Sequence, residues 1–401
     1  MTRHHAHFHD ARLLQPEPRR FAKERRPYGN PVALPKEPPR FIPPFFTNRT
    51  NLSLPLGTVV PHGNANVQDS ARLIFHMVGD TGGIHGTDVQ EAIGEEMERQ
   101  IRESKDGEKP AFFYHLGDVV YYNGESDLYT SQFYEPYQYY SAPIFAVPGN
   151  HDGDTQVHRG DRPDREPSLT GFRLNFCAEQ PEHLFSYRPT MTQPYVYWTL
   201  ETPVATIVGL YSNVDGSLDG RGADEQQGWL ELQLQGADPK KCLLIAVHHP
   251  PFSLDAPHGG YPDILVALDT AMQKTGRFAD AICSGHVHNY QRFTRLFDDH
   301  HIPYIVAGAG GYASRPQLLH QLQRDPSSGK SIEEEKLPFT TTEPGVTLDS
   351  FNRSAGGFLR MTVDGKSHTL TSEYFLVPFE GTPPAKPFDH FTLNWKSHKM
   401  A

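Results

Sequence analysis

The chain has 401 residues, of which 37% are hydrophobic, and a formal net charge of -11 at pH 7. This length is enough for one large domain or two smaller domains, each with a buried core. The negative charge argues against general binding to nucleic acid or to an anionic membrane surface, because phosphate groups would be repelled. No segment is apolar over the length of a membrane span, and the N-terminus lacks the apolar stretch of a secretory signal. We therefore expect a cytoplasmic protein.

The first 70 residues are rich in proline and arginine and keep neither a helical nor a strand periodicity. We interpret residues 1–70 as a proline-rich N-terminal extension, which either wraps over the folded domain or contacts a partner. The main folded domain is expected to span residues 71–380. Residues 381–401 are expected to form a C-terminal coil tail.

Six short apolar runs follow the extension, and each ends in glycine or in a polar residue. They are ARLIFHMVGD, PAFFYHLGD, APIFAVPGNHD, CLLIAVHHP, DAICSGHVH and IPYIVAGAGGY. Runs of this length and composition predict buried strands. Helical patterns lie between them at residues 88–104 and 224–234, and the first opens with a capping residue. Strands that alternate with helices predict an α/β architecture whose sheets are covered by helices.

Residues 357–377 alternate between apolar and polar side chains, as the strands of an antiparallel hairpin do. Asp364-Gly365 is the expected turn, and the hairpin would complete a second sheet. Two segments without clear periodicity, residues 151–173 and 255–263, follow strands that carry polar motifs. Long loops in such places are usually functional.

Side chains that can bind a metal ion stand directly after five of the apolar runs. They are Asp80, Asp118, Asn150, His248, His286 and His288. Taken singly, each has an ordinary structural interpretation, as a turn residue or a hydrogen-bonded histidine. In open α/β sheets, however, the carboxyl ends of the strands converge on one crevice, so these groups meet in space. Carboxylate, amide and imidazole ligands without thiolates suit iron, manganese or zinc, and they outnumber the ligands of one ion.

The same residues belong to five short motifs in a fixed order. The motifs are Asp80-Thr81-Gly82, Gly117-Asp118, Gly149-Asn150-His151-Asp152, Ala246-Val247-His248 and Gly285-His286-Val287-His288. In this order they resemble the calcineurin-like metallophosphoesterases, over about residues 72–312. The resemblance implies a four-layer α/β/β/α sandwich with two central mixed sheets, in which residues 71–380 form the catalytic domain.

The resemblance also implies a centre of two metal ions. In the implied assignment Asp118 bridges both ions, Asp80 and His288 hold the first, and Asn150, His248 and His286 hold the second. A carboxylate can bridge two ions about 3.5–4 Å apart, and such a pair clamps a phosphate group and activates a hydroxide. The expected cofactors are therefore two metal ions, iron together with iron, manganese or zinc.

One position departs from the pattern of the family. Many members have a histidine where this chain has Gly82, so the first ion would lose a nitrogen ligand. Tyr121 stands three residues after Asp118 and can replace it, as in the purple acid phosphatase branch, which the later GHVHNYQR also resembles. The alternative is that Tyr121 is an ordinary buried aromatic residue. The sequence shows neither the secretory signal nor the N-terminal β-sandwich domain of plant members.

Three further residues are candidates for catalysis. The resemblance places His151 within reach of the leaving oxygen as its proton donor. Asp152 either orients the imidazole of His151 or stabilises the turn. His258 lies on a loop where related purple acid phosphatases place histidines that contact the substrate. Two histidines inside the apolar runs are expected to be hydrogen-bonded structural residues, namely His76 and His115. His249, which follows the ligand His248, is expected either to be structural or to support a ligand.

Together these features predict a hydrolase of phosphate esters, with monoesters as the first choice of substrate. The nucleophile would be a metal-activated hydroxide, and a histidine would act as general acid. A phosphodiesterase on the same metal site is the alternative within this class. A non-catalytic metal-bearing scaffold that binds a partner through the extension is the alternative outside it. The expected partner is a small-molecule phosphate ester, without nucleic acid or membrane.

Overall fold

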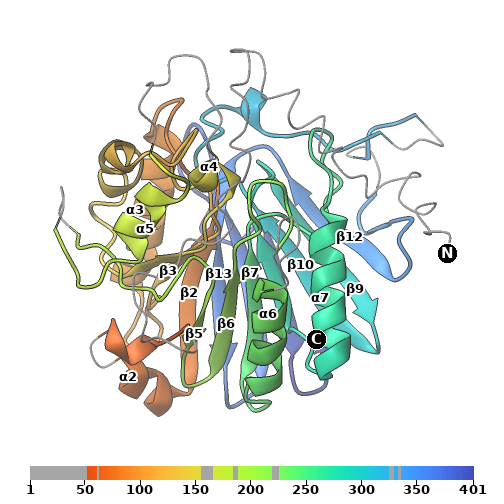
Figure 1. Ribbon diagram of the computed structural model, residues 1–401. Helices are drawn as coiled ribbons and strands as arrows, with labels where there is room; N and C mark the ends of the chain where they lie inside the picture. The colour runs from red at the N-terminus through yellow and green to blue at the C-terminus, as the bar shows by residue number, and fades with distance from the viewer. Residues whose placement is uncertain are drawn as a thin grey trace.

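The computed structural model describes residues 52–60, 63–154, 166–183, 188–218, 225–324, 329–332 and 336–401. Residues 1–51, which make up most of the predicted extension, lie outside these ranges. Two sheets stand face to face at the centre, and helices cover their outer faces (Figure 1). The predicted α/β/β/α sandwich with two mixed sheets is therefore confirmed.

The smaller sheet has seven strands in the order β16-β15-β14-β13-β2-β3-β4. They are β2 (Arg72–Val78), β3 (Phe113–His115), β4 (Ile144–Ala146), β13 (Gly356–Asp364), β14 (Thr369–Val377), β15 (Asp389–Asn394) and β16 (Lys399–Met400). The first three are parallel, and every other pair in this sheet is antiparallel. The hairpin predicted at 357–377 is confirmed as β13 and β14, and its turn begins after Asp364.

The predicted coil at residues 381–401 is wrong, because this segment contributes β15 and β16. In β15 the register runs from Thr369 opposite Asn394 to Tyr374 opposite Asp389. Phe391 and Leu393 alternate with polar residues and are buried in the core between the sheets. The period of two was therefore present in the sequence, but over so few residues that the flanking proline-rich stretch outweighed it.

The larger sheet has nine strands in the order β1-β5-β6-β7-β8-β10-β9-β12-β11. They are β1 (Ser53–Pro55), β5 (Trp198–Glu201), β6 (Ala205–Leu210), β7 (Cys242–Val247), β8 (Ala281–Ser284), β9 (Tyr290–Phe297), β10 (His300–Ala307), β11 (Phe339–Thr340) and β12 (Val346–Asn352). The central strands β6, β7, β8 and β10 are parallel. Because β1 pairs with β5, the end of the predicted extension takes part in the folded domain.

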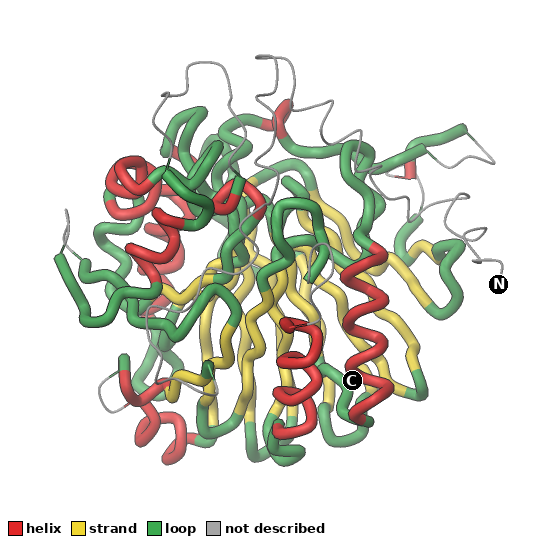
Figure 2. The backbone as a smooth tube through the Cα atoms, viewed as in Figure 1, coloured by secondary structure: helices red, strands yellow, loops and turns green. Residues whose placement is uncertain are grey.

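The helices cover the sheets on both outer sides (Figure 2). They are α2 (Gly63–Ser70), α3 (Asp88–Glu103), α4 (Asn150–Gly153), α5 (Thr170–Phe176), α6 (Glu225–Gly236) and α7 (Pro262–Thr275), with short 3-10 or π turns at Leu56–Thr58, Ser126–Leu128, Thr130–Tyr134 and Pro316–Leu318. The helices predicted at 88–104 and 224–234 correspond to α3 and α6. Within the described ranges, no helix combines the length and the apolar character needed to cross a membrane.

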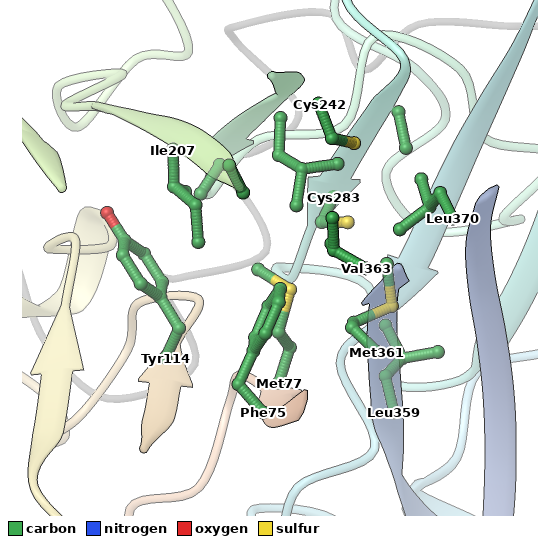
Figure 3. Packing of buried hydrophobic residues seen from close by; sticks show 14 of the residues in the cluster. Phe75, Met77, Tyr114, Ile207, Cys242, Cys283, Leu359, Met361, Val363 and Leu370 are labelled. Carbon is green, nitrogen blue, oxygen red and sulfur yellow. The ribbon is translucent and has the colours of Figure 1, made fainter. Parts of the chain in front are cut away.

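The core between the two sheets consists mainly of side chains from the strands. Figure 3 shows residues of β2, β13 and β14 packed against residues of β6, β7 and β8. Met77 and Met361 on one side, and Ile207 and Cys283 on the other, are fully buried. Strands that are buried on both faces have near-continuous apolar sequences. The layer fixes one sheet relative to the other and therefore holds together the loops that both sheets send to the same edge.

Candidate metal centre

The six predicted ligands meet at the carboxyl ends of the parallel strands. Three follow strands of the smaller sheet, and three follow strands of the larger sheet. In chain order they are Asp80 after β2, Asp118 after β3, Asn150 after β4, His248 after β7, and His286 and His288 after β8. All six side chains are buried. The site therefore lies where the edges of the two sheets come together, beside the short helix α4 (Figure 1).

The backbone turns sharply at three of these ligands. Asp80, Asp118 and His286 have φ angles of 59°, 54° and 68°, in the left-handed region that side chains other than glycine rarely adopt. Gly117 also has a positive φ, and a Cβ atom there would lie 2.6 Å from Nδ1 of His248. Strained backbone and close approach at several strand ends are typical of functional sites, where a side chain must be aimed at a fixed point.

One set of ligand atoms surrounds the amide oxygen of Asn150. Its Oδ1 lies 2.8 Å from Nδ1 of His286 and 3.1 Å from Nε2 of His248. Nε2 of His248 lies 3.4 Å from Oδ2 of Asp118. Ligands bound at 2.0–2.2 Å from one ion are about 2.8–3.6 Å apart for octahedral to tetrahedral angles, so these separations fit the edges of a coordination shell.

The protonation of His248 supports the presence of a cation. Its Nδ1 donates a hydrogen bond to the carbonyl oxygen of Leu116 at 2.8 Å. In the neutral ring, Nε2 then directs a lone pair at the oxygen atoms of Asn150 and Asp118. Burial alone would lower the pKa of His248, but the carboxylates of Asp118 and Asp80 raise it to about 9. The neighbouring carboxylates therefore favour positive charge at this position, which either a proton or a metal ion can supply.

A second set of ligand atoms lies around Asp80. Its Oδ1 is 3.5 Å from Nε2 of His288 and accepts a hydrogen bond from the hydroxyl of Tyr121 at 3.3 Å. Tyr121 is fully buried, and a Cβ atom on Gly82 would lie only 2.6 Å from its ring. The missing side chain at position 82 thus provides the space that the tyrosine ring occupies. Burial, together with the charges of Asp118 and Asp80, raises the pKa of Tyr121, so its phenol stays neutral without a cation.

Asp118 lies beside both sets. The backbone N–H of Asp80 donates to the carbonyl oxygen of Gly117 at 2.9 Å, which places the two loops next to each other. Oδ1 of Asp118 accepts the backbone N–H of His151 at 2.8 Å, while Oδ2 faces His248. The structure thus brings together the carboxylate predicted to bridge and the ligands predicted for each ion.

His151 stands at the edge of the site and is partly exposed. Its Nδ1 lies 2.9 Å from the carbonyl oxygen of Tyr122, which can only accept, so Nδ1 carries a proton. Nε2 lies 4.0 Å from Oδ2 of Asp118 and faces the ligand cluster. This tautomer and orientation present Nε2 to a group bound in the site.

Asp152 does not orient His151, and this alternative is corrected in favour of a role in the turn. The carboxylate of Asp152 accepts backbone N–H groups from Gly149 at 2.8 Å and from Val119 and Val120 at 3.1 Å. Nδ1 of His151 instead donates to the backbone carbonyl oxygen of Tyr122. Asp152 therefore fastens the Gly-Asp loop to the Gly-Asn-His-Asp loop and supports the ligands through the backbone.

The histidines outside the motifs differ in their surroundings. His258 is partly buried, and its ring lies 4.6 Å from that of His286. His76, His115 and His249 are buried, and one ring nitrogen of each is hydrogen-bonded, to Tyr140, Thr81 and Ser212 respectively.

Two neighbours of the ligands were missed by the sequence interpretation. The hydroxyl of Tyr261 lies 2.6 Å from Nε2 of His286. The ring of His320 lies 4.5 Å from that of His288 and 5.1 Å from that of His258. Neither residue belongs to a motif, and each reaches the site only through the path of its loop. Only Pro262 gave a local signal, because proline at the start of a helix places Tyr261 at the helix cap.

The sandwich fold, with paired carboxylate, amide and imidazole ligands at the strand ends, defines a metal-dependent phosphoric ester hydrolase. The model of the calcineurin-like phosphoesterase family matches residues 75–290, which is more than half of the chain. The chain belongs to the calcineurin-like phosphoesterase family, and the resemblance seen in the motifs is confirmed.

Curated relatives match more than half of the chain. A probable glycerophosphodiester phosphodiesterase of Arcobacter nitrofigilis is 26% identical over 60% of this chain and 77% of its own length. The human tartrate-resistant acid phosphatase type 5 is 27% identical over 62% of this chain and 76% of its own length.

Solved structures agree on the fold. A purple acid phosphatase from yellow lupin seeds aligns with a TM-score of 0.56 and 17% identity, over 81% of this chain but only 54% of its own. GAP50, the anchor in the inner membrane complex of Plasmodium, aligns with a TM-score of 0.53 and 13% identity, over 80% of this chain and 89% of its own. At these identities the likeness concerns the fold alone.

Proposed function

We propose that the site holds two metal ions and hydrolyses phosphate monoesters. Asp80, Tyr121 and His288 would hold the first ion, the second would be held by Asn150, His248 and His286, and Asp118 would bridge them. The observation that carries the proposal is the convergence of four ligand side chains. Oδ1 of Asn150 lies 2.8 Å from Nδ1 of His286 and 3.1 Å from Nε2 of His248, and this Nε2 atom lies 3.4 Å from Oδ2 of Asp118. Two bound ions would polarise the phosphate and supply a nucleophile at neutral pH.

The chain's own residues complete the proposed chemistry. His151 would protonate the departing oxygen through Nε2, because Nδ1 is held by the carbonyl oxygen of Tyr122. His258 would contact the bound ester. Asp152 would keep the two ligand loops in register through its three backbone hydrogen bonds. These groups are positioned in advance, so little reorganisation is needed during the reaction.

The proposed metal pair is iron with iron, manganese or zinc. Tyr121 supports iron in the first position, since a buried phenolate ligand compensates for the histidine that Gly82 replaces. The likeness to the human acid phosphatase supports monoesters as substrates. The likeness to a glycerophosphodiester phosphodiesterase supports diesters as the second candidate. The substrate in either case would be a small molecule rather than a nucleic acid or a membrane.

Hydrolysis of two model esters tests this function. Metal-loaded protein is assayed with nitrophenyl phosphate and with bis-nitrophenyl phosphate, next to Asp118→Asn and a control, Asp106→Asn, at a fully exposed carboxylate. We expect faster turnover of the monoester, at least a hundredfold loss in Asp118→Asn and no loss in the control. Faster turnover of the diester would favour the second candidate. No turnover of either ester would contradict the proposal and favour the non-catalytic scaffold.

A further inference from the structure

A second group of metal-binding side chains lies beside the proposed centre. It consists of Asp255 and His258, on the loop after β7, and His320, on the loop after β10. One ligand atom of each residue lies within 4.8 Å of those of the other two. We call these three residues the side cluster. The proposed function uses only His258 among them.

Backbone hydrogen bonds hold the two loops of the side cluster in a fixed register. The N–H of Ala256 donates to the carbonyl oxygen of Gln321 at 2.9 Å, and the N–H of Gln323 donates to that of Leu254 at 2.9 Å. The Gln323 side chain also donates to the carbonyl oxygen of Asp255 at 3.0 Å. Because this short ladder brackets the cluster, its three side chains are brought together by the fold rather than by chance surface contact.

The carboxylate of Asp255 is the most informative member. It is fully buried, and Oδ2 accepts the backbone N–H of His258 at 2.9 Å and lies 3.4 Å from Nδ1 of His320. Oδ1 is equally buried but has no hydrogen-bond partner among the described residues. A buried carboxylate oxygen without a partner is costly, so a missing positive group is expected there.

The donor set of the side cluster suits a divalent transition metal. Two imidazoles and one carboxylate form the three-ligand set of many open zinc sites, in which a fourth position stays free for water or substrate. The 3.4 Å between Nδ1 of His320 and Oδ2 of Asp255 matches the edge of such a site, about 3.4 Å for ligands at 2.0–2.2 Å.

From these observations we infer that Asp255, His258 and His320 bind a third divalent metal ion, of the zinc class, next to the binuclear centre. The ring of His258 packs 4.6 Å from that of His286, and the ring of His320 packs 4.5 Å from that of His288. The third ion would thus lie beside the ligands of the binuclear centre. His258 would then reach the substrate through this ion, which adds positive charge for a phosphate group.

The third ion is expected to bind more weakly than the other two. Only one carboxylate supports it, and two neighbouring cations would repel it. The binding site itself does not rest on the proposed function, because its ligands are separate from the six that hold the binuclear centre. Zinc binding therefore tests it whether or not any ester is hydrolysed.

The test compares the zinc content of matched variants of the full chain. Chelator-stripped protein is saturated with Zn²⁺, desalted rapidly and measured by inductively coupled plasma mass spectrometry. We expect His320→Ala and His258→Ala to hold one ion per chain fewer than the wild type. A control, His390→Ala, removes an exposed imidazole on β15 and should change nothing. Histidines of the N-terminal segment contribute equally to all variants and cancel in the difference.

A second comparison separates the side cluster from the binuclear centre. Asp118→Asn dismantles the proposed bridge, and the double variant Asp118→Asn with His320→Ala removes the side cluster as well. The inference predicts one zinc ion fewer in the double variant than in the single variant. Equal zinc content in these two proteins, or in the wild type and both single histidine variants, would overturn the third site.

Discussion

At the scale of single residues, Gly82 and Tyr121 act as a complementary pair. A Cβ atom at position 82 would lie 2.6 Å from the ring of Tyr121 and 2.7 Å from Oε1 of Gln132. Gln132 in turn holds the backbone of Tyr121 through two hydrogen bonds, of 2.9 and 3.0 Å. A histidine at position 82 could therefore not coexist with Tyr121 in this place. With glycine at position 82, the phenol oxygen of Tyr121 faces the Asp80 carboxylate, instead of the imidazole nitrogen that a histidine would supply.

Replacing Tyr121 by phenylalanine tests the proposed phenolate ligand. The ring stays in the pocket of Gly82, but the oxygen 3.3 Å from Asp80 is lost. We expect the visible tyrosinate-to-iron absorption band of iron-loaded protein to disappear while the fold is retained. Tyr139→Phe, at an exposed position, is the matched control and should keep the band. An unchanged band in Tyr121→Phe, or no band in fully iron-loaded wild type, would show that Tyr121 is not a ligand.

Tyr261 is expected to position a ligand rather than to react. Its hydroxyl lies 2.6 Å from Nε2 of His286, and such contacts fix the orientation of a metal-binding imidazole. Tyr261→Phe should weaken metal affinity about 10- to 100-fold, measured by competition with a chelator, because partners of this kind typically contribute that much. Tyr139→Phe should leave the affinity unchanged. Equal affinities in the two variants would assign Tyr261 a packing role only.

The sequence predicted the motif residues well but not the residues that reach them from elsewhere. Asp80 and Asp118 could be found because each stands at the end of an apolar run, where topology decides its neighbours. Tyr261 and His320 carry no such signal, since their proximity depends on loop paths. Asp152 has the residue type expected of an orienting carboxylate, yet it accepts backbone N–H groups from its own loop and from the loop after β3.

At the scale of secondary-structure elements, the central strands were predictable from the sequence, whereas the start of helix α7 was not. The apolar runs that become β2, β7 and β8 are continuous and bounded by polar residues or glycine. Helix α7 begins at Pro262, inside a segment that was interpreted as loop. Its buried residues Ile264, Leu265 and Leu268 follow the helical period, and proline at the first turn is favourable. The pattern was present, but the irregular loop before it obscured the start.

The turn after β3 depends on a glycine, because a side chain at this position would be both strained and crowded. Gly117 has a φ of 94°, and a Cβ atom there would lie 2.6 Å from Nδ1 of His248 and 2.7 Å from the backbone nitrogen of Gly149. Gly117→Ala should lower the free energy of unfolding by about 3 kcal/mol or more in urea titration. Gly107→Ala, at a φ of 83° with open space around it, should cost only about 1 kcal/mol. Equal losses of unfolding free energy in the two variants would mean that the neighbours of Gly117 move enough to accommodate a Cβ atom.

Buried His76 in β2 predicts a pH dependence of stability. Burial lowers its pKa to about 3, from an ordinary value of 6.5, with a hydrogen bond to Gln100 opposing the shift. As pH falls below 6.5 the unfolded chain binds a proton that the folded chain excludes, so stability is lost between pH 6.5 and about 3.

Urea unfolding of chelator-treated protein at pH 7 and pH 5 measures this loss. The wild type should lose about 2 kcal/mol more than His76→Gln between these values. The control His390→Gln should behave like the wild type, because its side chain is exposed. A loss in His76→Gln equal to that of the wild type would contradict the assignment of a neutral buried histidine.

At the scale of the whole molecule, the metal centre depends on the packing of two sheets. Asp80, Asp118 and Asn150 come from the smaller sheet, whereas His248, His286 and His288 come from the larger one. The apolar layer between the sheets, seen in Figure 3, fixes their relative position. The overall architecture could be predicted because each strand is short, buried and joined to the next by a helix or loop. The register that aligns the six ligands could not, since it is set by core packing between distant segments.

Anomalous X-ray diffraction from crystals soaked in Mn²⁺ or Zn²⁺ tests the central claim most directly, because it locates ions without relying on activity. The account predicts one peak bounded by Asn150, His248, His286 and Asp118, and a second bounded by Asp80, His288 and the same Asp118 carboxylate. Both peaks should be absent from Asp118→Asn crystals or strongly weakened in them. A fully soaked wild-type crystal with one peak or none among these residues would contradict a binuclear centre.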